Sequence, residues 1–338
     1  MGHHQELADT VEKLVQKGKG ILAADESAPT IAKRFAAIGV ESTEQKRREY
    51  RSLIFSTPEL GDYISGVILY EETLNQKSLD NAPMAELLLR QGIVPGIKVD
   101  KGKGPLANAP GDEITFGLDG LEERLSGYRD QGARFAKWRN VYHITDTNPG
   151  ALAIEANAEV LARYAAVCQS LGIVPIVEPE VLIDGYHTIE HCALVSEAVL
   201  RAVFAALHRH GVLLEGMLLK PSMVTPGKSH TSQAGPERVA EATLNVFRRA
   251  VPAAVPGIVF LSGGQTPEQA TANLNAINQH GPQPWELSFS YGRALQEPAQ
   301  KAWAGELDNG PAAQSAMHRR AKLNGAAREG HYSPDMEG

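Results

Sequence analysis

Several short apolar runs of the sequence end in charged side chains, and the lysines among them could act as nucleophiles. Lys220 closes the run Leu218-Leu219-Lys220-Pro221 and has the most apolar approach. A lysine in apolar surroundings beside other cations loses its proton more readily, and its free amine can then attack a carbonyl carbon. Taken alone, a lysine at the end of a strand is more often a solvated edge group. The pattern nevertheless makes Lys220 the candidate for a Schiff-base lysine.

A carboxyl group in a similar setting is the candidate for proton transfer. Glu178 lies in the run Ile176-Val177-Glu178-Pro179, where a carboxyl in apolar surroundings can exchange protons near neutral pH. An ion pair with one of the lysines is an equally compatible role. Lys98 and Lys137 have polar neighbours and fit electrostatic roles, whereas Asp25 could either join them or cap the next helix.

Eight apolar runs of strand length predict the elements that must position these side chains. They are residues 20–24, 64–69, 93–99, 135–141, 173–177, 217–219, 258–261 and 287–289. Helical patterns lie between them, the clearest at 190–210, at 237–250, and at 42–55, where Ser42 and Gln45 have capping-box spacing. Strands that are apolar throughout and alternate with helices are typical of parallel sheets covered on both faces.

Eight is the number of strands that closes a (β/α)8 TIM barrel, which is the α/β fold the sequence favours. An open doubly wound sheet is the alternative. No linker divides the chain, so residues 1–327 are predicted to form a single domain. Residues 328–338 lack apolar periodicity and are predicted to form a mobile C-terminal tail.

A barrel would bring the charged strand ends together around one cavity. Three lysines and two arginines there would repel one another unless carboxylates and a bound anion balanced them. Ser262-Gly263-Gly264 after the seventh run and Gly292-Arg293 after the eighth lie where barrels commonly bind phosphate through backbone N–H groups. A Gly-Gly pair after a strand is usually only a turn, but Arg293 could grip an anion with two hydrogen bonds.

The composition excludes several other classes of protein. The 338 residues are 43% hydrophobic and 22% charged, which is ordinary for a globular protein. A formal net charge of −7 argues against nucleic-acid binding, and no apolar run is long enough to span a membrane. The two cysteines have no CxxC spacing, so a reducing, cytoplasmic setting is expected. The H-x-x-E-H spacing from His187 to His191 occurs in certain zinc peptidases, but no motif places a third ligand, and we expect no metal site.

Seven segments of the chain, in order, resemble those of class I fructose-1,6-bisphosphate aldolases. They are 20–27 (GILAADES), 96–102 (GIKVDKG), 136–139 (AKWR), 177–180 (VEPE), 218–221 (LLKP), 260–265 (FLSGGQ) and 289–296 (FSYGRALQ). The resemblance covers essentially the whole chain. It implies a barrel enzyme of glycolysis and gluconeogenesis that reversibly cleaves fructose 1,6-bisphosphate to dihydroxyacetone phosphate and glyceraldehyde 3-phosphate, without metal or cofactor and commonly as a homotetramer.

The resemblance also implies roles for individual residues. Lys220 would form the Schiff base, and Glu178 would transfer protons. Asp25, Lys137 and Glu180 would position and polarise the reacting groups. The C1 phosphate would be held by Ser262, Gly263, Gly292 and Arg293. The distal phosphate would be held by Lys33, Arg34 and Arg139, with Lys98 as a further pocket lysine and the hydroxyls of Ser27 and Thr30 nearby.

The sequence differs from the family at two places. Ala28-Pro29-Thr30 follows Ser27 where the animal enzymes have Thr-Gly-Ser, so the loop is stiffer and one hydroxyl remains at Thr30. Family members commonly extend beyond the segment at Tyr332-Ser333-Pro334 to a terminal tyrosine that assists carbanion protonation, and Tyr332 is not given that role. Two other functions remain open on the sequence: a sedoheptulose-bisphosphate aldolase, and a catalytically idle scaffold that binds acidic or filamentous partners.

Overall fold

Eight parallel strands close into a barrel in this computed structural model, which describes residues 3–338. Around the barrel the strands follow the order β1-β10-β9-β8-β7-β6-β3-β2. Their bounds are β1 Gly20–Ala24, β2 Ile64–Leu69, β3 Val94–Lys98, β6 Phe135–Tyr142, β7 Val174–Val181, β8 Leu218–Leu219, β9 Gly257–Phe260 and β10 Glu286–Tyr291. Each coincides with one of the eight apolar runs, so the predicted (β/α)8 barrel is confirmed.

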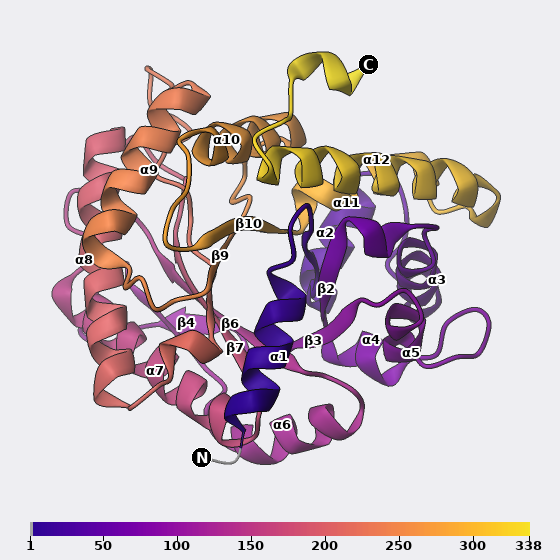
Figure 1. Cartoon of the computed structure of the whole chain (residues 1–338), viewed down its shortest axis with the longest axis horizontal. Helices are drawn as coiled ribbons and strands as arrows, with labels where there is room; N and C mark the ends of the chain where they lie inside the picture. Colours follow the sequence, from indigo (N-terminus) through magenta and orange to yellow (C-terminus); the bar gives the residue numbers. More distant parts are fainter. Residues whose placement is uncertain (1–2) are drawn as a thin grey trace.

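The helices form a ring around the strands (Figure 1). They are α2 Ala28–Ala36, α3 Glu44–Phe55, α4 Glu71–Asn75, α5 Met84–Leu89, α6 Leu121–Asp130, α7 Ala151–Ser170, α8 Ile189–Arg209, α9 Pro236–Ala250, α10 Pro267–Gln279, α11 Arg293–Trp303 and α12 Gly310–Arg328. The larger of two hydrophobic clusters fills the space between this ring and the barrel. Both faces of the sheet are therefore covered, which explains why the strands are apolar throughout.

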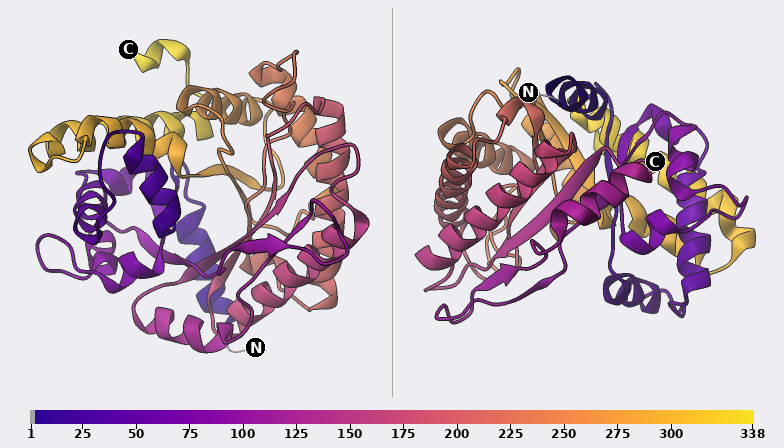
Figure 2. Two further views of the ribbon diagram at one scale, coloured as in Figure 1. Left: turned by 180° about the vertical axis from the view of Figure 1, so that it is seen from behind. Right: turned by 90° about the horizontal axis from the view of Figure 1, so that it is seen from below.

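A further helix, α1 (His4–Leu14), lies across the N-terminal end of the barrel (Figure 1). Its buried residues Leu7, Val11 and Leu14 follow helical spacing and pack against apolar side chains inside the barrel. Burying each such side chain is worth roughly 1.5–3 kcal/mol. The sequence analysis found no role for this segment. The opposite end, seen in the reverse view of Figure 2, is where the strands lead into the loops that carry the charged residues.

The smaller hydrophobic cluster lies inside the barrel (the inner cluster), and its packing is determined by one aromatic ring, that of Phe135. The Phe135 side chain crosses the barrel interior, and a Cβ atom added to Gly96 would lie 2.3 Å from that ring. Such a contact is impossible without a shift of the ring or the strand, so the position requires glycine. The interior below the charged strand ends is thus closely packed with apolar side chains.

Three local features differ from the sequence predictions. The helix at 44–55 is capped by Thr43, whose side chain accepts a hydrogen bond from the Lys46 N–H, so the Ser42–Gln45 capping box is wrong. Strand β7 extends four residues further than predicted because its pairing with β6 continues to Tyr142 and Val181. A two-stranded hairpin, β4 (Lys103–Pro105) and β5 (Glu113–Thr115), lies outside the barrel and has no strong apolar signal.

The C-terminal residues pack against the barrel helices in this structure. Arg328 is the last residue of α12, so this helix passes the predicted domain boundary at 327. The Tyr332 N–H donates to Asn275, and the buried Arg320 donates two hydrogen bonds to the Glu337 carboxylate, at 2.7 and 2.8 Å. These contacts could not be predicted from the sequence, because they depend on residues of α10 and α12. The mobility of residues 328–338 stays a prediction.

Candidate active site

Residue alternation along β6 and β7 places four charged side chains inside the barrel mouth. Successive side chains of a strand point to opposite faces, so Lys137 and Arg139 point the same way, as do Glu178 and Glu180. The inner cluster contains Phe135 and Ile176, which are two residues before Lys137 and Glu178. The same strand faces that are apolar near α1 therefore become charged near the mouth.

The central side chains form a chain of alternating charges. The Lys137 Nζ atom lies 2.7 Å from Asp25 Oδ2 and 3.2 Å from Glu178 Oε2. The Lys220 Nζ atom lies 3.3 Å from the other Glu178 oxygen. Lys137, Glu178 and Lys220 are each only 3% exposed, so these contacts are little screened by solvent. Glu178 thus contacts both lysines, and its ion-pair role is compatible with proton transfer to or from the Lys220 side.

Two further ion pairs flank this chain. Lys98 Nζ lies 2.6 Å from Asp100 Oδ1, and Asp100 also accepts a hydrogen bond from the Arg139 N–H. Arg139 pairs with Glu180 across β6 and β7. The mouth therefore holds four cations and four carboxylates in alternation, which are the carboxylates that the sequence predicted would balance the lysines and arginines together with a bound anion. Asp100 was not singled out as a site residue, although its place two residues after Lys98 was the available signal.

The electrostatics separate the roles of the lysines. Burial opposes ionisation of Asp25, but Lys137, followed by Lys220 and Lys98, outweighs it and holds the pKa of Asp25 well below its usual value. Burial would likewise lower the pKa of Lys137, but Asp25 and Glu178 raise that pKa above the usual lysine value. Lys137 is therefore a fixed cation at neutral pH. Lys220, with one carboxylate contact, is the better placed nucleophile.

A second group of residues lies beside this cluster and can bind an anion. Ser262 is buried two residues after the end of β9, and Gly263 and Gly264 both have positive φ, at 49° and 89°. Gly292 caps α11 without a side-chain hydrogen bond, so N–H groups in the first turn of this helix remain available. A Cβ atom added to Gly264 would lie 3.5 Å from Arg293 Nη2. The predicted phosphate residues of the two loops are therefore neighbours.

Ser290 is a functional candidate that the sequence analysis missed. It lies on β10 two residues before Gly292, is 1% exposed, and its hydroxyl has no hydrogen-bond partner among the described residues. Buried hydroxyl groups normally have a hydrogen-bond partner, so a ligand group is a candidate partner for Ser290. Its place in the segment with Gly292 and Arg293 was the signal that could have found it.

Only some of the predicted site residues on α2 lie at the site. A Cβ atom added to Gly292 would lie 3.7 Å from Arg34 Nη2, so Arg34 reaches the group that was assigned to the C1 phosphate. The hydroxyls of Ser27 and Thr30 are 3.1 Å apart at the start of α2, where both can face an incoming ligand. Lys33 is exposed on α2. Ser27 caps α2, so Asp25 does not serve as the helix cap.

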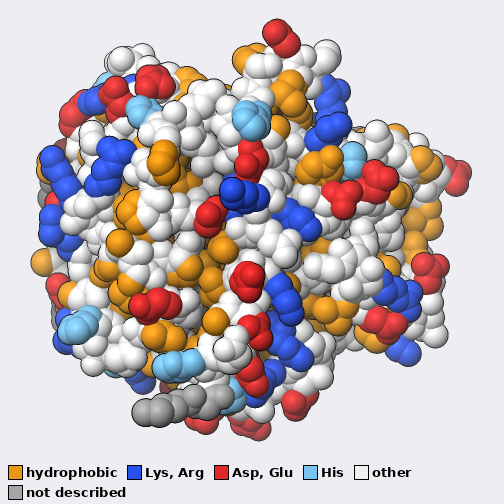
Figure 3. All heavy atoms as spheres, in the orientation of Figure 1, with side chains coloured by type: hydrophobic (Ala, Val, Ile, Leu, Met, Phe, Trp, Pro, Cys, Tyr) orange, Lys and Arg blue, Asp and Glu red, His pale blue; other side chains and the backbone are white. Residues whose placement is uncertain are grey.

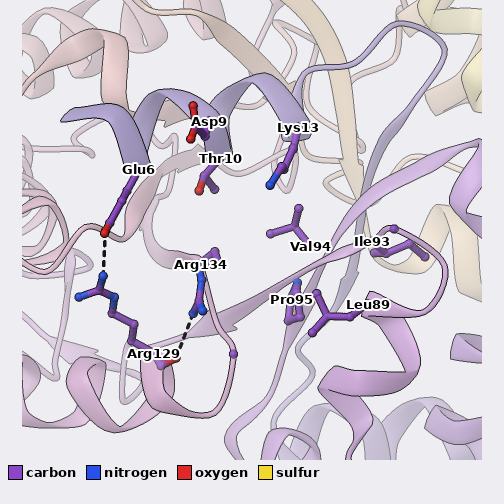
Figure 4. A pocket seen from close by; sticks show the side chains of 12 residues that line it. Glu6, Asp9, Thr10, Lys13, Leu89, Ile93, Val94, Pro95, Arg129 and Arg134 are labelled. Carbon is purple, nitrogen blue, oxygen red and sulfur yellow. Dashed lines mark hydrogen bonds and ion pairs between the residues drawn. The ribbon is translucent and has the colours of Figure 1, made fainter. Parts of the chain in front are cut away.

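A pocket of about 520 Å³ lies at the other end of the barrel, but it lacks a group of charged side chains brought together as at the mouth (Figure 4). It lies between α1 and the starts of β3 and β6. Arg129 there is paired with Glu6 at 2.8 Å, and Arg134 donates to the backbone carbonyl of Arg129 at the end of α6. Acidic and basic side chains also alternate over the surface of this face (Figure 3). We therefore place the active site at the carboxyl ends of the strands.

No cluster of three or more His, Cys, Asp or Glu side chains suited to a metal ion occurs within residues 3–338. His187 and His191 line a separate pocket with Asp146 and Tyr186. Both nitrogens of His187 are buried without a hydrogen-bond partner among the described residues. Burial, followed by the neighbouring His191 and His230, lowers the pKa of His187, so this imidazole is neutral at physiological pH.

Comparison with known proteins identifies the family. The model of the family "Fructose-bisphosphate aldolase class-I" matches residues 6–338. The chain belongs to the class I fructose-bisphosphate aldolases. As a member of this family it is a lyase that acts on a sugar phosphate, which confirms the function predicted from the sequence.

Full-length relatives agree with this assignment. The chain is 55% identical over 329 residues to "Probable fructose-bisphosphate aldolase class 1" of Xanthomonas axonopodis pv. citri, covering 97% of this chain and 98% of that protein. It is 53% identical to the rat "Fructose-bisphosphate aldolase C", covering 99% and 93%. A solved structure of the Plasmodium falciparum aldolase, in complex with TRAP and a small-molecule inhibitor, has a TM-score of 0.96 at 52% identity and covers 97% and 95% of the two chains.

Among the described residues of this aldolase, no helix combines the length and apolar character needed to cross a bilayer.

Proposed function

We propose that this aldolase cleaves fructose 1,6-bisphosphate through an imine on Lys220. The observation that carries the proposal is the contact of Lys220 Nζ with Glu178 at 3.3 Å inside a mouth where Lys137 is already a fixed cation. The Lys220 amine attacks the C2 carbonyl, and the resulting carbinolamine loses water to form a protonated imine. Glu178 supplies the proton that leaves with this water.

The same carboxylate then promotes carbon–carbon cleavage. Glu178 removes the proton of the C4 hydroxyl, the C3–C4 bond breaks, and its electron pair moves into the protonated imine to form an enamine. Glyceraldehyde 3-phosphate leaves. Protonation of the enamine at C3 and hydrolysis of the imine release dihydroxyacetone phosphate and restore the free amine. Asp25, Lys137 and Glu180 hold the hydroxyls of the substrate through this sequence.

Substrate orientation follows from the two ends of the cavity. Ser262, Gly263, Gly292 and Arg293 bind the C1 phosphate through backbone N–H groups, a hydroxyl and a guanidinium. The distal phosphate is bound by Arg139, Lys98, Lys33 and the hydroxyls of Ser27 and Thr30. Arg34, which the family resemblance assigns to the distal phosphate, reaches Gly292 and contributes at the C1 phosphate. We further propose that the enzyme is a cytoplasmic homotetramer, as the resemblance to the family implies.

Borohydride trapping tests the covalent step. Reduction in the presence of dihydroxyacetone phosphate should fix the triose on one lysine, and peptide mass mapping should find it on Lys220 because this amine is the nucleophile. Reduction without the triose is the control. An adduct on Lys98 or Lys137, or no adduct with active enzyme, would show that the assignment is wrong.

The orientation of the substrate has its own test at Arg293. Because the C1 phosphate is common to both ketoses, Arg293→Ala should raise the KM of fructose 1-phosphate and of fructose 1,6-bisphosphate alike, by about tenfold or more, with the loss of a charged hydrogen-bond donor. Steady-state kinetics on both substrates measure this. A loss confined to the bisphosphate would place Arg293 at the distal phosphate instead.

A further inference from the structure

The carboxylate of Glu26, next to Asp25, is buried under the barrel mouth and collects an unusual number of donors. Glu26 is 7% exposed and lies between α2, α3 and α11. It accepts hydrogen bonds from Arg34, from Arg51 at 2.9 Å and from Gln296 at 2.7 Å. No role for Glu26 was predicted from the sequence.

Two of these partners, Arg51 and Gln296, fix the position of the Glu26 carboxylate. Arg51 is 1% exposed and also donates to the Thr73 hydroxyl at 2.6 Å. The Gln296 amide bridges Glu26 and the Ala23 carbonyl, each at 2.7 Å, and accepts a hydrogen bond from the Tyr50 hydroxyl. With every one of these groups engaged, the Glu26 carboxylate has a single position.

The third partner, Arg34, is partly exposed and reaches the loop at Gly292. Its side chain is 23% exposed, whereas that of Arg51 is 2% exposed. One of its terminal nitrogens, Nη1, donates to Glu26, and the other, Nη2, lies 3.7 Å from where a Cβ of Gly292 would be. A guanidinium is planar, so fixing one nitrogen fixes the direction of the other. Glu26 therefore aims Arg34 at the loop that begins α11.

We propose that Glu26 is a positioning residue for phosphate recognition: it holds Arg34 beside Gly292 so that the free face of the guanidinium meets a phosphate bound there. The inference rests on the proposed function, because it uses the phosphate site at Gly292 and Arg293. Two guanidiniums face one carboxylate, so the cluster keeps one formal positive charge in a buried setting. That charge attracts the phosphate, and Glu26 fixes where it is.

Because Glu26 is charged, two explanations of its role predict opposite effects of Glu26→Gln on phosphate binding. If Glu26 only neutralised the arginines, Glu26→Gln would add positive charge and tighten phosphate binding. If Glu26 positions Arg34, the same change should raise the KM of fructose 1,6-bisphosphate and the inhibition constant of inorganic phosphate about tenfold, with kcat within about twofold. Glu26→Asp keeps the charge but shortens the reach, and should weaken phosphate binding in the same direction.

A double-mutant cycle shows whether the effect passes through Arg34. In an Arg34→Ala background, Glu26→Gln should change the inhibition constant of phosphate by less than about twofold, because the group it positions is already gone. An undiminished effect in that background would overturn the proposal. So would unchanged or tighter phosphate binding in Glu26→Gln with the thermal midpoint intact.

Two further variants keep the test interpretable. Gln296→Met removes one donor to Glu26 without a change of charge, and should raise the phosphate inhibition constant even if Glu26→Gln does not fold. An unchanged constant would contradict the proposal. Glu286→Gln is the control: it removes a carboxylate that pairs with the buried Arg328 at 3.0 Å at the other end of the barrel, and should leave the phosphate inhibition constant unchanged.

Borohydride trapping on Lys220 separates this inference from the proposed function. If the wild type forms the Lys220 adduct but the Glu26 variants bind phosphate as the wild type does, only this inference is overturned. If the wild type forms no adduct on Lys220, the proposed function is overturned.

Discussion

Lys220→Arg should lower kcat for cleavage by at least about 10³-fold, a loss of about 4 kcal/mol of transition-state stabilisation. Arginine keeps the positive charge next to Glu178 but stays protonated, so it has no free amine and cannot form an imine. Stopped-flow or coupled assays of fructose 1,6-bisphosphate cleavage measure the rate, and borohydride should trap no triose on the variant.

The control for this experiment is substrate binding. Equilibrium binding of a non-cleavable bisphosphate should change little, because the proposed function assigns the phosphate groups to other residues. Cleavage by Lys220→Arg at more than about a tenth of the wild-type rate would show that the covalent step runs on another residue.

Lys137→Met should produce the second largest loss, about 10²-fold or more in kcat. The variant leaves Asp25 and Glu178 as buried carboxylates without the cation that lies 2.7 and 3.2 Å from them. Removing one partner of a buried ion pair commonly costs about 3–5 kcal/mol of stability. Thermal or urea unfolding should therefore report a destabilised protein, and Lys137→Arg, which keeps the charge, should be affected less.

The pH dependence of Lys137→Met has a definite sign. In the wild type the pKa of Asp25 is depressed, so its contribution to stability is present above the carboxyl pKa of the unfolded chain, about 3.9, and is lost only as pH falls through the lower folded value. Without Lys137 the folded pKa of Asp25 rises. The stability difference between variant and wild type should therefore be largest near neutral pH and shrink towards acid pH. A difference that is constant with pH would show that Lys137 acts through packing alone.

The barrel was predictable because its signal is local. Eight apolar runs separated by helical patterns needed no knowledge of contacts, and the same runs showed Lys220, Glu178 and Lys137 at or near their ends. The role of α1 was not predictable, since Leu7, Val11 and Leu14 find their partners only once the barrel has closed. A residue pattern that is weak by itself becomes a core element through tertiary packing.

The candidate site shows the same limit. The strand-end positions of Asp25 and Lys220 could be read from the sequence, but the pairing of Arg139 with Glu180 depends on the register of β6 and β7. The role of Glu26 could not be predicted for another reason. Its partners Arg34, Arg51 and Gln296 come from three helices and lie up to 270 positions away in sequence. Buried polar networks of this kind have no periodicity to detect.

The packing of α1 against the barrel also limits the direction from which substrate can bind and products can leave. Apolar side chains of α1 and of the strands fill the barrel at that end, so a substrate can approach the charged strand ends only from the opposite end of the barrel. Under the proposed mechanism the two products therefore leave from the same end of the barrel. The aldehyde is free once the carbon–carbon bond has broken, whereas the fragment that the proposal attaches to Lys220 can leave only after water has hydrolysed the imine.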